Sequence, residues 1–419
     1  MRKPRTQKKQ YGLHALLFAL TLFTTTISGT GWMTGRYVFD LPWNEIWQGL
    51  WFSVPFLGIL TVHEFGHYFL CRFHGIKASL PYYIPFWLGT FSIGTMGAFI
   101  RIRSMPETRR QFFDVGIAGP LAGFAVALAV LTYGFTHLPA REDIFRIHPE
   151  YKRYGLAYEK YVYTAEFFQE EDSLNFLAAR AKGIVPKTDE KGVETTFAPR
   201  PDVYREIMEG NFSLGNNLLL HFFKHYVAES PDLVPNRYEF MHYPVLFAGY
   251  LALFFTALNL IPIGQLDGGH VLYGLIGYGK HQRVSPVLFV MYIFYAGLGV
   301  VRANGTVNFI GAELEPVVGI PLYLFFLYLV FYKMTDNPRD TLLLSVGVLA
   351  AQWLVTVYFG LHGYPGWLVF GFILGRFLGV YHPPALHEQP LDWKRKLLGW
   401  LALVIFVLCF TPEPFRFGV

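Results

Sequence analysis

Long apolar runs separated by short polar segments form the main hydrophobic pattern of this chain. A helix needs about 20 mostly apolar residues to cross a bilayer. The pattern predicts an all-α polytopic membrane protein with about nine transmembrane helices, or with eight, because the last two runs are short. The predicted spans are residues 11–28, 47–70, 113–134, 243–263, 285–301, 317–332, 341–360, 365–380 and 397–410.

One charged stretch interrupts this pattern. Residues 135–241 contain runs such as EDIFRIHPEYKRY and FFQEEDSLNFLAARAKG, in which charged and apolar positions recur periodically. We expect this stretch to form a small helical insert outside the membrane. Its charges do not predict orientation, because long loops cross a membrane largely regardless of their charge.

The composition supports a membrane environment. Hydrophobic residues make up 53% of the 419 residues and charged residues only 16%, whereas a soluble domain carries about 25% charged residues. We therefore expect the lipid bilayer to surround much of the chain. The net charge of +5 includes no lysine-rich stripe, so no nucleic-acid partner is expected. Two cysteines cannot make a disulfide framework.

Basic residues in the short loops predict the orientation of the chain, since such loops tend to stay cytoplasmic. With nine crossings, the basic loops share one side with a cytoplasmic N-terminus. The basic start and the apolar run after it also resemble a signal peptide, but no clear cleavage site follows, so a retained first span is expected. We expect an integral protein of a bacterial cytoplasmic membrane.

The second predicted span contains an H-E-x-x-H pattern, formed by His63, Glu64 and His67. On a helix the two histidines lie one turn apart on the same face, where they can bind one zinc ion. Glu64 lies beside them and can deprotonate a zinc-bound water. Ionisable side chains inside a span are costly and usually functional, which argues against two ordinary buried histidines and an unrelated glutamate.

A catalytic zinc site needs a third protein ligand and one open position. Asp267 follows the fourth predicted apolar run, within the stretch NLIPIGQLDGGH. Pro262 and the nearby glycines interrupt the helix there and free the backbone to approach a site. The alternative is a helix-ending turn with a capping Asp267, but the H-E-x-x-H pattern favours Asp267 as the third zinc ligand.

The HEFGH sequence and the later N-L-I-P-x-x-x-L-D-G sequence together resemble the site-2 protease family of intramembrane zinc metalloproteases. The resemblance covers about 47–134 and 211–276. It implies a three-helix core, one zinc ion per chain held by His63, His67 and Asp267, and Glu64 as the catalytic carboxylate. It also implies that Asn259 helps to hold the substrate carbonyl or oxyanion, although an ordinary interhelical hydrogen bond is the alternative for Asn259.

The resemblance divides the chain into five expected segments. They are an N-terminal helix and outer loop (1–46), a first core part (47–134), the insert (135–241), a second core part (242–276) and C-terminal helices (277–419). The stretches GTMGAFIRIR, DVGIAGPLAGF and GQLDGGH look like the branch with chloroplast and cyanobacterial homologues. No PDZ module is evident in the insert.

Two further stretches bear on the site. Residues 94–103 alternate like a strand, and the family resemblance implies a short re-entrant β-hairpin there; a cytoplasmic surface hairpin is the alternative. Gly119 and Gly123 have the spacing that lets another helix approach closely. His221 and His225 also lie one turn apart, but no glutamate accompanies them, so we expect no metal there.

The expected function is therefore the hydrolysis of peptide bonds within the transmembrane helices of other membrane proteins, as in regulated intramembrane proteolysis. The alternatives are a non-proteolytic metal-binding protein or transporter and a catalytically silent homologue. A transporter would spread polar residues over several spans, and an intact Glu64 argues against a silent homologue. The sequence does not indicate the substrate, the oligomeric state, or the roles of the insert and the C-terminal helices.

Overall fold

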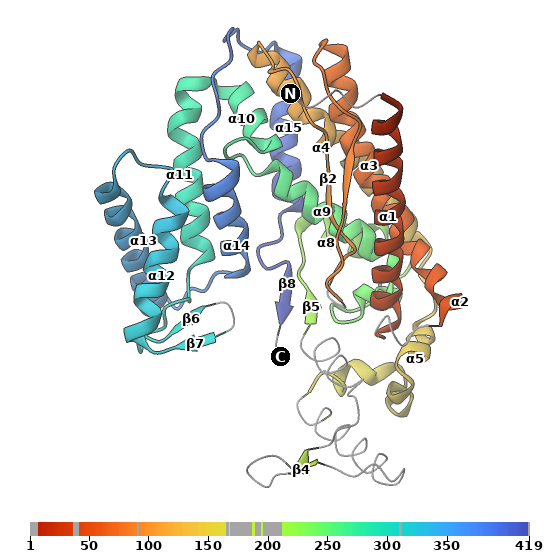
Figure 1. Cartoon of the computed structure of the whole chain (residues 1–419). Coiled ribbons are helices and arrows are strands. Elements are labelled where there is room, and N and C mark those ends of the chain that lie inside the picture. The colour runs from red at the N-terminus through yellow and green to blue at the C-terminus, as the bar shows by residue number, and fades with distance from the viewer. Residues whose placement is uncertain are drawn as a thin grey trace.

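The structure, a computed structural model, describes residues 7–36, 42–89, 92–164, 167, 187–188, 194–195, 212–309 and 312–417. Helices form most of it, and short antiparallel strand pairs lie between them (Figure 1). The longer helices are α1 (Gln7–Thr34), α3 (Leu50–Phe73), α4 (Arg109–Thr136), α9 (Pro244–Leu260), α10 (Asp267–Ile276), α11 (Tyr278–Ala296), α12 (Pro316–Phe331), α13 (Pro338–Phe359), α14 (Gly366–Ile373) and α15 (Trp393–Cys409).

Short helical turns are α2 (Trp43–Ile46), η2 (Trp47–Gly49), η3 (Arg141–Asp143), α5 (Ile144–Ile147), η4 (Pro149–Lys160), α8 (Leu218–Phe222), η6 (Phe223–Val227), η7 (Pro231–Leu233), η8 (Phe240–His242) and η9 (Leu374–Leu378). The strands are β1 (Tyr82–Pro85), β2 (Thr95–Phe99), β3 (Lys187–Thr188), β4 (Glu194–Thr195), β5 (Phe212–Leu214), β6 (Val307–Phe309), β7 (Ala312–Leu314) and β8 (Phe415–Phe417). Each strand pairs with one other, in the order β1–β2, β3–β4, β5–β8 and β6–β7.

Four helical segments in the described part of the chain are long and apolar enough to cross a membrane: Tyr11–Thr34, Trp43–Phe73, Arg109–Thr136 and Pro338–Phe359. Pro244–Leu260, Pro316–Phe331 and Gly366–Leu378 are apolar but shorter. A helix therefore covers much of each predicted apolar run, while nine crossings stay a prediction. The helix in the predicted run 243–263 ends at Leu260, before the end of the run, because Pro262 interrupts helical structure.

Helices α3, α4 and α9 pack against one another, with α10 and α15 beside them. Glycines allow α3 and α4 to approach closely: a Cβ atom at Gly66 would lie 2.6 Å from the carbonyl oxygen of Ala118. Such a distance leaves no room for a side chain. This contact confirms the close helix approach that Gly119 and Gly123 predict, and the three-helix arrangement carries the residues of the two sequence motifs.

An antiparallel hairpin of β1 and β2 lies between α1 and the core. Tyr82 pairs with Phe99, and Tyr83 pairs with Ala98. The first helix fixes the far end of this hairpin, because Thr24 donates a hydrogen bond to the carbonyl oxygen of Gly94 at 2.6 Å. Strands β1 and β2 therefore form a hairpin beside the core, whereas a re-entrant position of this hairpin in the membrane stays a prediction.

Helices α11 to α14 form a second hydrophobic cluster beside the first (Figure 1). The chain then returns to the first cluster, where α15 packs on α9 and α10 and β8 pairs with β5. Arg395 at the start of α15 makes two hydrogen bonds to the buried Asp114 of α4, at 2.7 and 2.8 Å. The C-terminal helix therefore supports α4 directly.

The described part of the insert comprises short helical turns after α4 and before α9 and the strands β3, β4 and β5. Helix α5 lies beyond the end of the bundle (Figure 1). A small aromatic cluster holds the first part together, centred on Ile144, Tyr151 and Tyr158. The rest of the predicted insert, including most of 165–211, lies outside the described residues. The five-segment division stays a prediction.

Candidate metal centre

A break in helical structure between α9 and α10 brings the sequence motifs together. His63, Glu64 and His67 lie in the middle of α3, a continuous helix. Asp267 is the first residue of α10, which begins after the turn that ends α9. Gly264 in that turn has a φ of +61°, a left-handed conformation that glycine adopts without strain. The turn therefore places Asp267 next to α3 rather than further along α9.

The three predicted ligands converge on one point. Nε2 of His63 lies 3.1 Å from Nε2 of His67. Oδ2 of Asp267 lies 3.5 Å from the His63 nitrogen and 3.3 Å from the His67 nitrogen. A tetrahedral zinc ion binds nitrogen and oxygen at about 2.0–2.2 Å, which sets neighbouring ligand atoms about 3.3–3.5 Å apart. The donor set and its spacing therefore fit zinc.

A hydrogen bond to the backbone orients the His67 ring and fixes its tautomer for metal binding. Its Nδ1 lies 2.7 Å from the carbonyl oxygen of Val115, to which it can donate a hydrogen bond. That bond holds the proton on Nδ1 and leaves Nε2 with a free lone pair, as in most metal-binding histidines. Both histidines are buried. Helix α4 therefore contributes the Val115 carbonyl that orients His67, a residue outside both sequence motifs.

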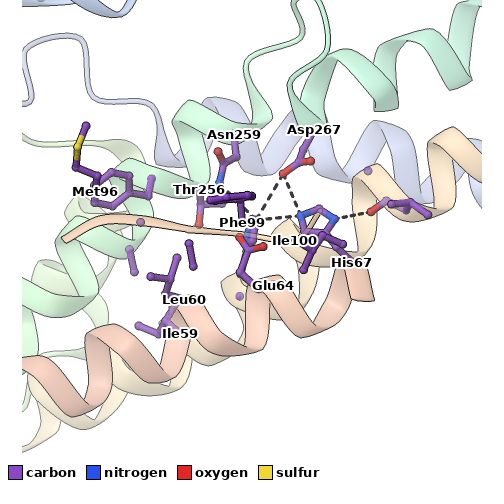
Figure 2. Close-up of a pocket in the computed structure, with 18 of the residues that line it drawn as sticks. Ile59, Leu60, Glu64, His67, Met96, Phe99, Ile100, Thr256, Asn259 and Asp267 are labelled. Atoms are coloured by element: carbon purple, nitrogen blue, oxygen red, sulfur yellow. Dashed lines mark hydrogen bonds and ion pairs between the residues drawn. The ribbon is translucent and has the colours of Figure 1, made fainter. Parts of the chain in front are cut away.

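Glu64 and Asn259 approach the same point from different elements. Glu64 is buried and follows His63 on α3. The amide nitrogen Nδ2 of Asn259, near the end of α9, lies 3.4 Å from Nε2 of His63. Figure 2 shows both side chains beside the group formed by Asp267 and His67. The structure therefore places all five predicted site residues in one place, while their roles stay predictions.

A cavity of about 330 Å³ contains this group and extends along β2. Figure 2 shows Met96 at the end away from Asp267, and Phe99 and Ile100 next to Glu64. The backbone of Ile100 lies close to the Glu64 carboxylate. The walls away from the polar group are apolar, with Phe56, Ile59, Leu60 and Phe255 among them. The cavity therefore combines a polar end at the metal-binding group with apolar walls.

Two other groups of histidines differ from this site. The ring centroids of His221 and His225 lie 4.1 Å apart with the rings tilted by 40°, and Nδ1 of His225 can donate to the His221 carbonyl oxygen at 2.8 Å. They do not belong to either group of three metal-binding side chains found in the described ranges. The second such group is His148, Glu239 and His242. His148 lies 94 residues before His242, so no short motif contains all three members.

Two imidazoles and one carboxylate that can bind a metal, with a neighbouring glutamate, form an arrangement that supports zinc metallopeptidase chemistry. Here the site lies among helices that are apolar enough to cross a membrane, which defines a membrane-bound member of that class. The chain belongs to Peptidase family M50, whose sequence pattern matches residues 51–300. Family and helices together identify an integral membrane protein.

Three curated relatives show the same class. "Probable zinc metalloprotease EGY2, chloroplastic" of Oryza sativa subsp. indica is 25% identical over 240 residues, covering 57% of this chain and 32% of that protein. "Probable zinc metalloprotease EGY1, chloroplastic" of Arabidopsis thaliana is 25% identical over 232 residues, covering 55% and 30%. "Probable zinc metalloprotease EGY2, chloroplastic" of Arabidopsis thaliana is 38% identical over 76 residues, covering 18% and 13%.

The matches span about a third or less of the length of these relatives. Their names confirm the resemblance to a branch with chloroplast homologues. No solved structure matches the chain significantly.

Proposed function

We propose that this chain is an intramembrane zinc endopeptidase, which hydrolyses peptide bonds in the transmembrane segments of other membrane proteins. The observation that carries the proposal is the convergence of His63, His67 and Asp267 within 3.1–3.5 Å, beside Glu64. An apolar cavity leads to this group. Membership of Peptidase family M50 supports the same activity.

His63, His67 and Asp267 would bind one zinc ion at this site. When bound, zinc polarises a peptide carbonyl and lowers the pKa of water. Glu64 accepts a proton from the attacking water and returns it to the leaving amine. Asn259 donates an N–H to the carbonyl oxygen of the substrate, where negative charge develops in the transition state.

The substrate reaches this group as an extended strand. A helical peptide hides its carbonyl groups in internal hydrogen bonds, so a transmembrane helix must unwind before it can be cut. Strand β2 pairs only with β1 among the described strands, and its residues Met96 to Phe99 line the cavity together with the following Ile100. An extended segment added to β2 would pass directly beside Glu64.

The remaining parts of the proposal concern cellular context. The partners are membrane proteins with a transmembrane helix, and the cut serves regulated intramembrane proteolysis. The relatives are named as chloroplastic, so a bacterial cytoplasmic membrane and a cytoplasmic N-terminus rest on the sequence pattern alone.

A purified chain and a model transmembrane substrate test the proposal. Glu64→Gln keeps the size of the side chain but removes the base, so this variant should retain zinc and lose cleavage. His63→Ala and Asp267→Ala should lose both, because each removes a direct metal ligand. Metal analysis alongside the cleavage assay separates these outcomes. Normal cleavage by Glu64→Gln would refute the mechanism and favour a non-proteolytic metal-binding protein or transporter.

A further inference from the structure

A second group of metal-binding side chains lies at the other end of α9. His148 precedes η4, and Glu239 and His242 lie in the turn before α9. Asn259, beside the first site, comes 17 residues after His242, and 17 residues of helix span about 25 Å. The second group is therefore separate from the candidate catalytic centre.

The geometry of this group matches that of the first. Nε2 of His148 lies 3.3 Å from Nε2 of His242. Oε2 of Glu239 lies 3.5 Å from each of these nitrogens. Three donor atoms 3.3–3.5 Å apart fit one tetrahedrally coordinated ion such as zinc.

Burial makes this arrangement costly without an ion. The exposed fractions of His148, Glu239 and His242 are 1%, 2% and 8%. Among the residues that the structure describes, none donates a hydrogen bond to the buried Oε2 of Glu239, and an unsatisfied buried acceptor costs about 1–3 kcal/mol, or more for a charged group. A cation at the centre of the group would satisfy this oxygen and both nitrogens.

The outer nitrogens of both rings are held by partners. Nδ1 of His242 lies 3.1 Å from the carbonyl oxygen of Met33, at the end of α1, and can donate to it. Nδ1 of His148 lies 3.2 Å from Oε1 of Glu150. These contacts favour a proton on Nδ1 of each ring, so each Nε2 can present its lone pair to a metal, which is the usual support of metal-binding histidines.

The third donor is oriented in the same way. Tyr163 donates a hydrogen bond to Oε1 of Glu239, and Asn236 donates to the Tyr163 hydroxyl at 2.9 Å. One carboxylate oxygen is therefore fixed by a hydrogen bond while the other points at the two imidazoles.

We propose that His148, Glu239 and His242 bind a second divalent metal ion of zinc type, whose role is structural. Two imidazoles and a carboxylate are donors that zinc accepts readily. The ion would connect the insert, through His148, to the start of α9, and the Met33 contact would extend this connection to α1. The chain would then hold two metal ions, one more than the sequence predicts. This proposal does not depend on the proposed proteolysis.

The test removes the ligands of the first site by mutation and measures the zinc that remains bound per chain. In a full-length His63→Ala/His67→Ala variant, metal analysis should find about one zinc per chain, at the second site. Adding Glu239→Gln, which preserves shape, should reduce that content to near zero. Adding His221→Ala/His225→Ala, which removes an exposed pair of histidines, should leave it unchanged.

Two further measurements on the His63→Ala/His67→Ala protein distinguish loss of the second site from misfolding. X-ray absorption of the bound zinc in the His63→Ala/His67→Ala protein should show two imidazole ligands. Added zinc should raise its melting temperature, and adding Glu239→Gln should abolish that rise. The proposal is wrong if the His63→Ala/His67→Ala protein contains no zinc. It is also wrong if adding Glu239→Gln does not reduce the zinc content. Neither result depends on whether the wild-type chain cleaves a substrate.

Discussion

Gly119 of α4 lies directly against His67 of α3: a Cβ atom added at Gly119 would lie 2.1 Å from Nε2 of the imidazole. Real Cβ atoms do not approach so closely, so any side chain at this position must displace the ring. The affected nitrogen is the one that faces His63 and Asp267. The small residue on α4 therefore leaves room for a predicted metal ligand.

Gly119→Ala should therefore disrupt the metal centre without removing any ligand. Displaced from its position, His67 would also lose its bond to the Val115 carbonyl, and losing such support typically lowers metal affinity about 10–100-fold. Zinc titration should show this loss, and cleavage should fall with it. Gly58→Ala on α3 is the matched control, because a Cβ atom there meets nothing within 4 Å. Equal zinc affinity in both variants would contradict the prediction.

Asn259→Ala should separate catalysis from metal binding. If Asn259 donates to the substrate oxygen, its loss should reduce kcat by about 10²-fold, the effect of removing one such donor. Zinc content should not change, because the Asn259 amide is not a predicted ligand. A structural hydrogen bond to α3 would instead lower the melting temperature while kcat stays near the wild-type value. Kinetics and thermal unfolding of the same preparation therefore distinguish the two roles.

Local motifs made the first site predictable from sequence. His63 and His67 are four residues apart, and the helical repeat alone puts them on one face. Asp267 lies about 200 residues later, and its position beside them depends on the turn between α9 and α10, whose geometry only the structure shows. The family motif nevertheless identified Asp267 from its L-D-G context.

Other features depend on packing that no short pattern encodes. His148 and His242 are 94 residues apart, and only folding brings them together. Helix α9 has 17 residues and is largely buried by neighbouring helices, so its apolar character reflects protein contacts as well as lipid. Apolar runs therefore predicted where helices form, but not how many of them cross a membrane.

Membrane topology can be tested with two engineered cysteines. Lys160 at the end of η4 and Lys280 near the start of α11 are both exposed. In a background with Cys71→Ala and Cys409→Ala, Lys160→Cys and Lys280→Cys should react with an impermeant maleimide from opposite sides of the membrane. The basic loops predict that Lys280 is cytoplasmic. Both sites should react after permeabilisation, and labelling of both from one side of intact membranes would contradict the predicted crossings.

Strand β2 provides the last prediction. Successive N–H groups of a strand point to opposite edges, so the N–H of Ala98 points to the same edge as that of Ile100, which faces Glu64. Ala98→Pro removes this donor from the edge on which an extended substrate would add a strand. Cleavage should fall strongly while zinc content stays normal, because no ligand is changed.

Ala98→Ser is the control, since it keeps both the N–H and a small side chain. It should cleave at close to the wild-type rate. The comparison also separates substrate binding from general damage to the hairpin, because a disordered hairpin would lower the melting temperature as well. If Ala98→Pro cleaved as fast as Ala98→Ser, the substrate would have to reach Glu64 without pairing to β2, and the cavity walls formed by α3 and α9 would have to position it instead.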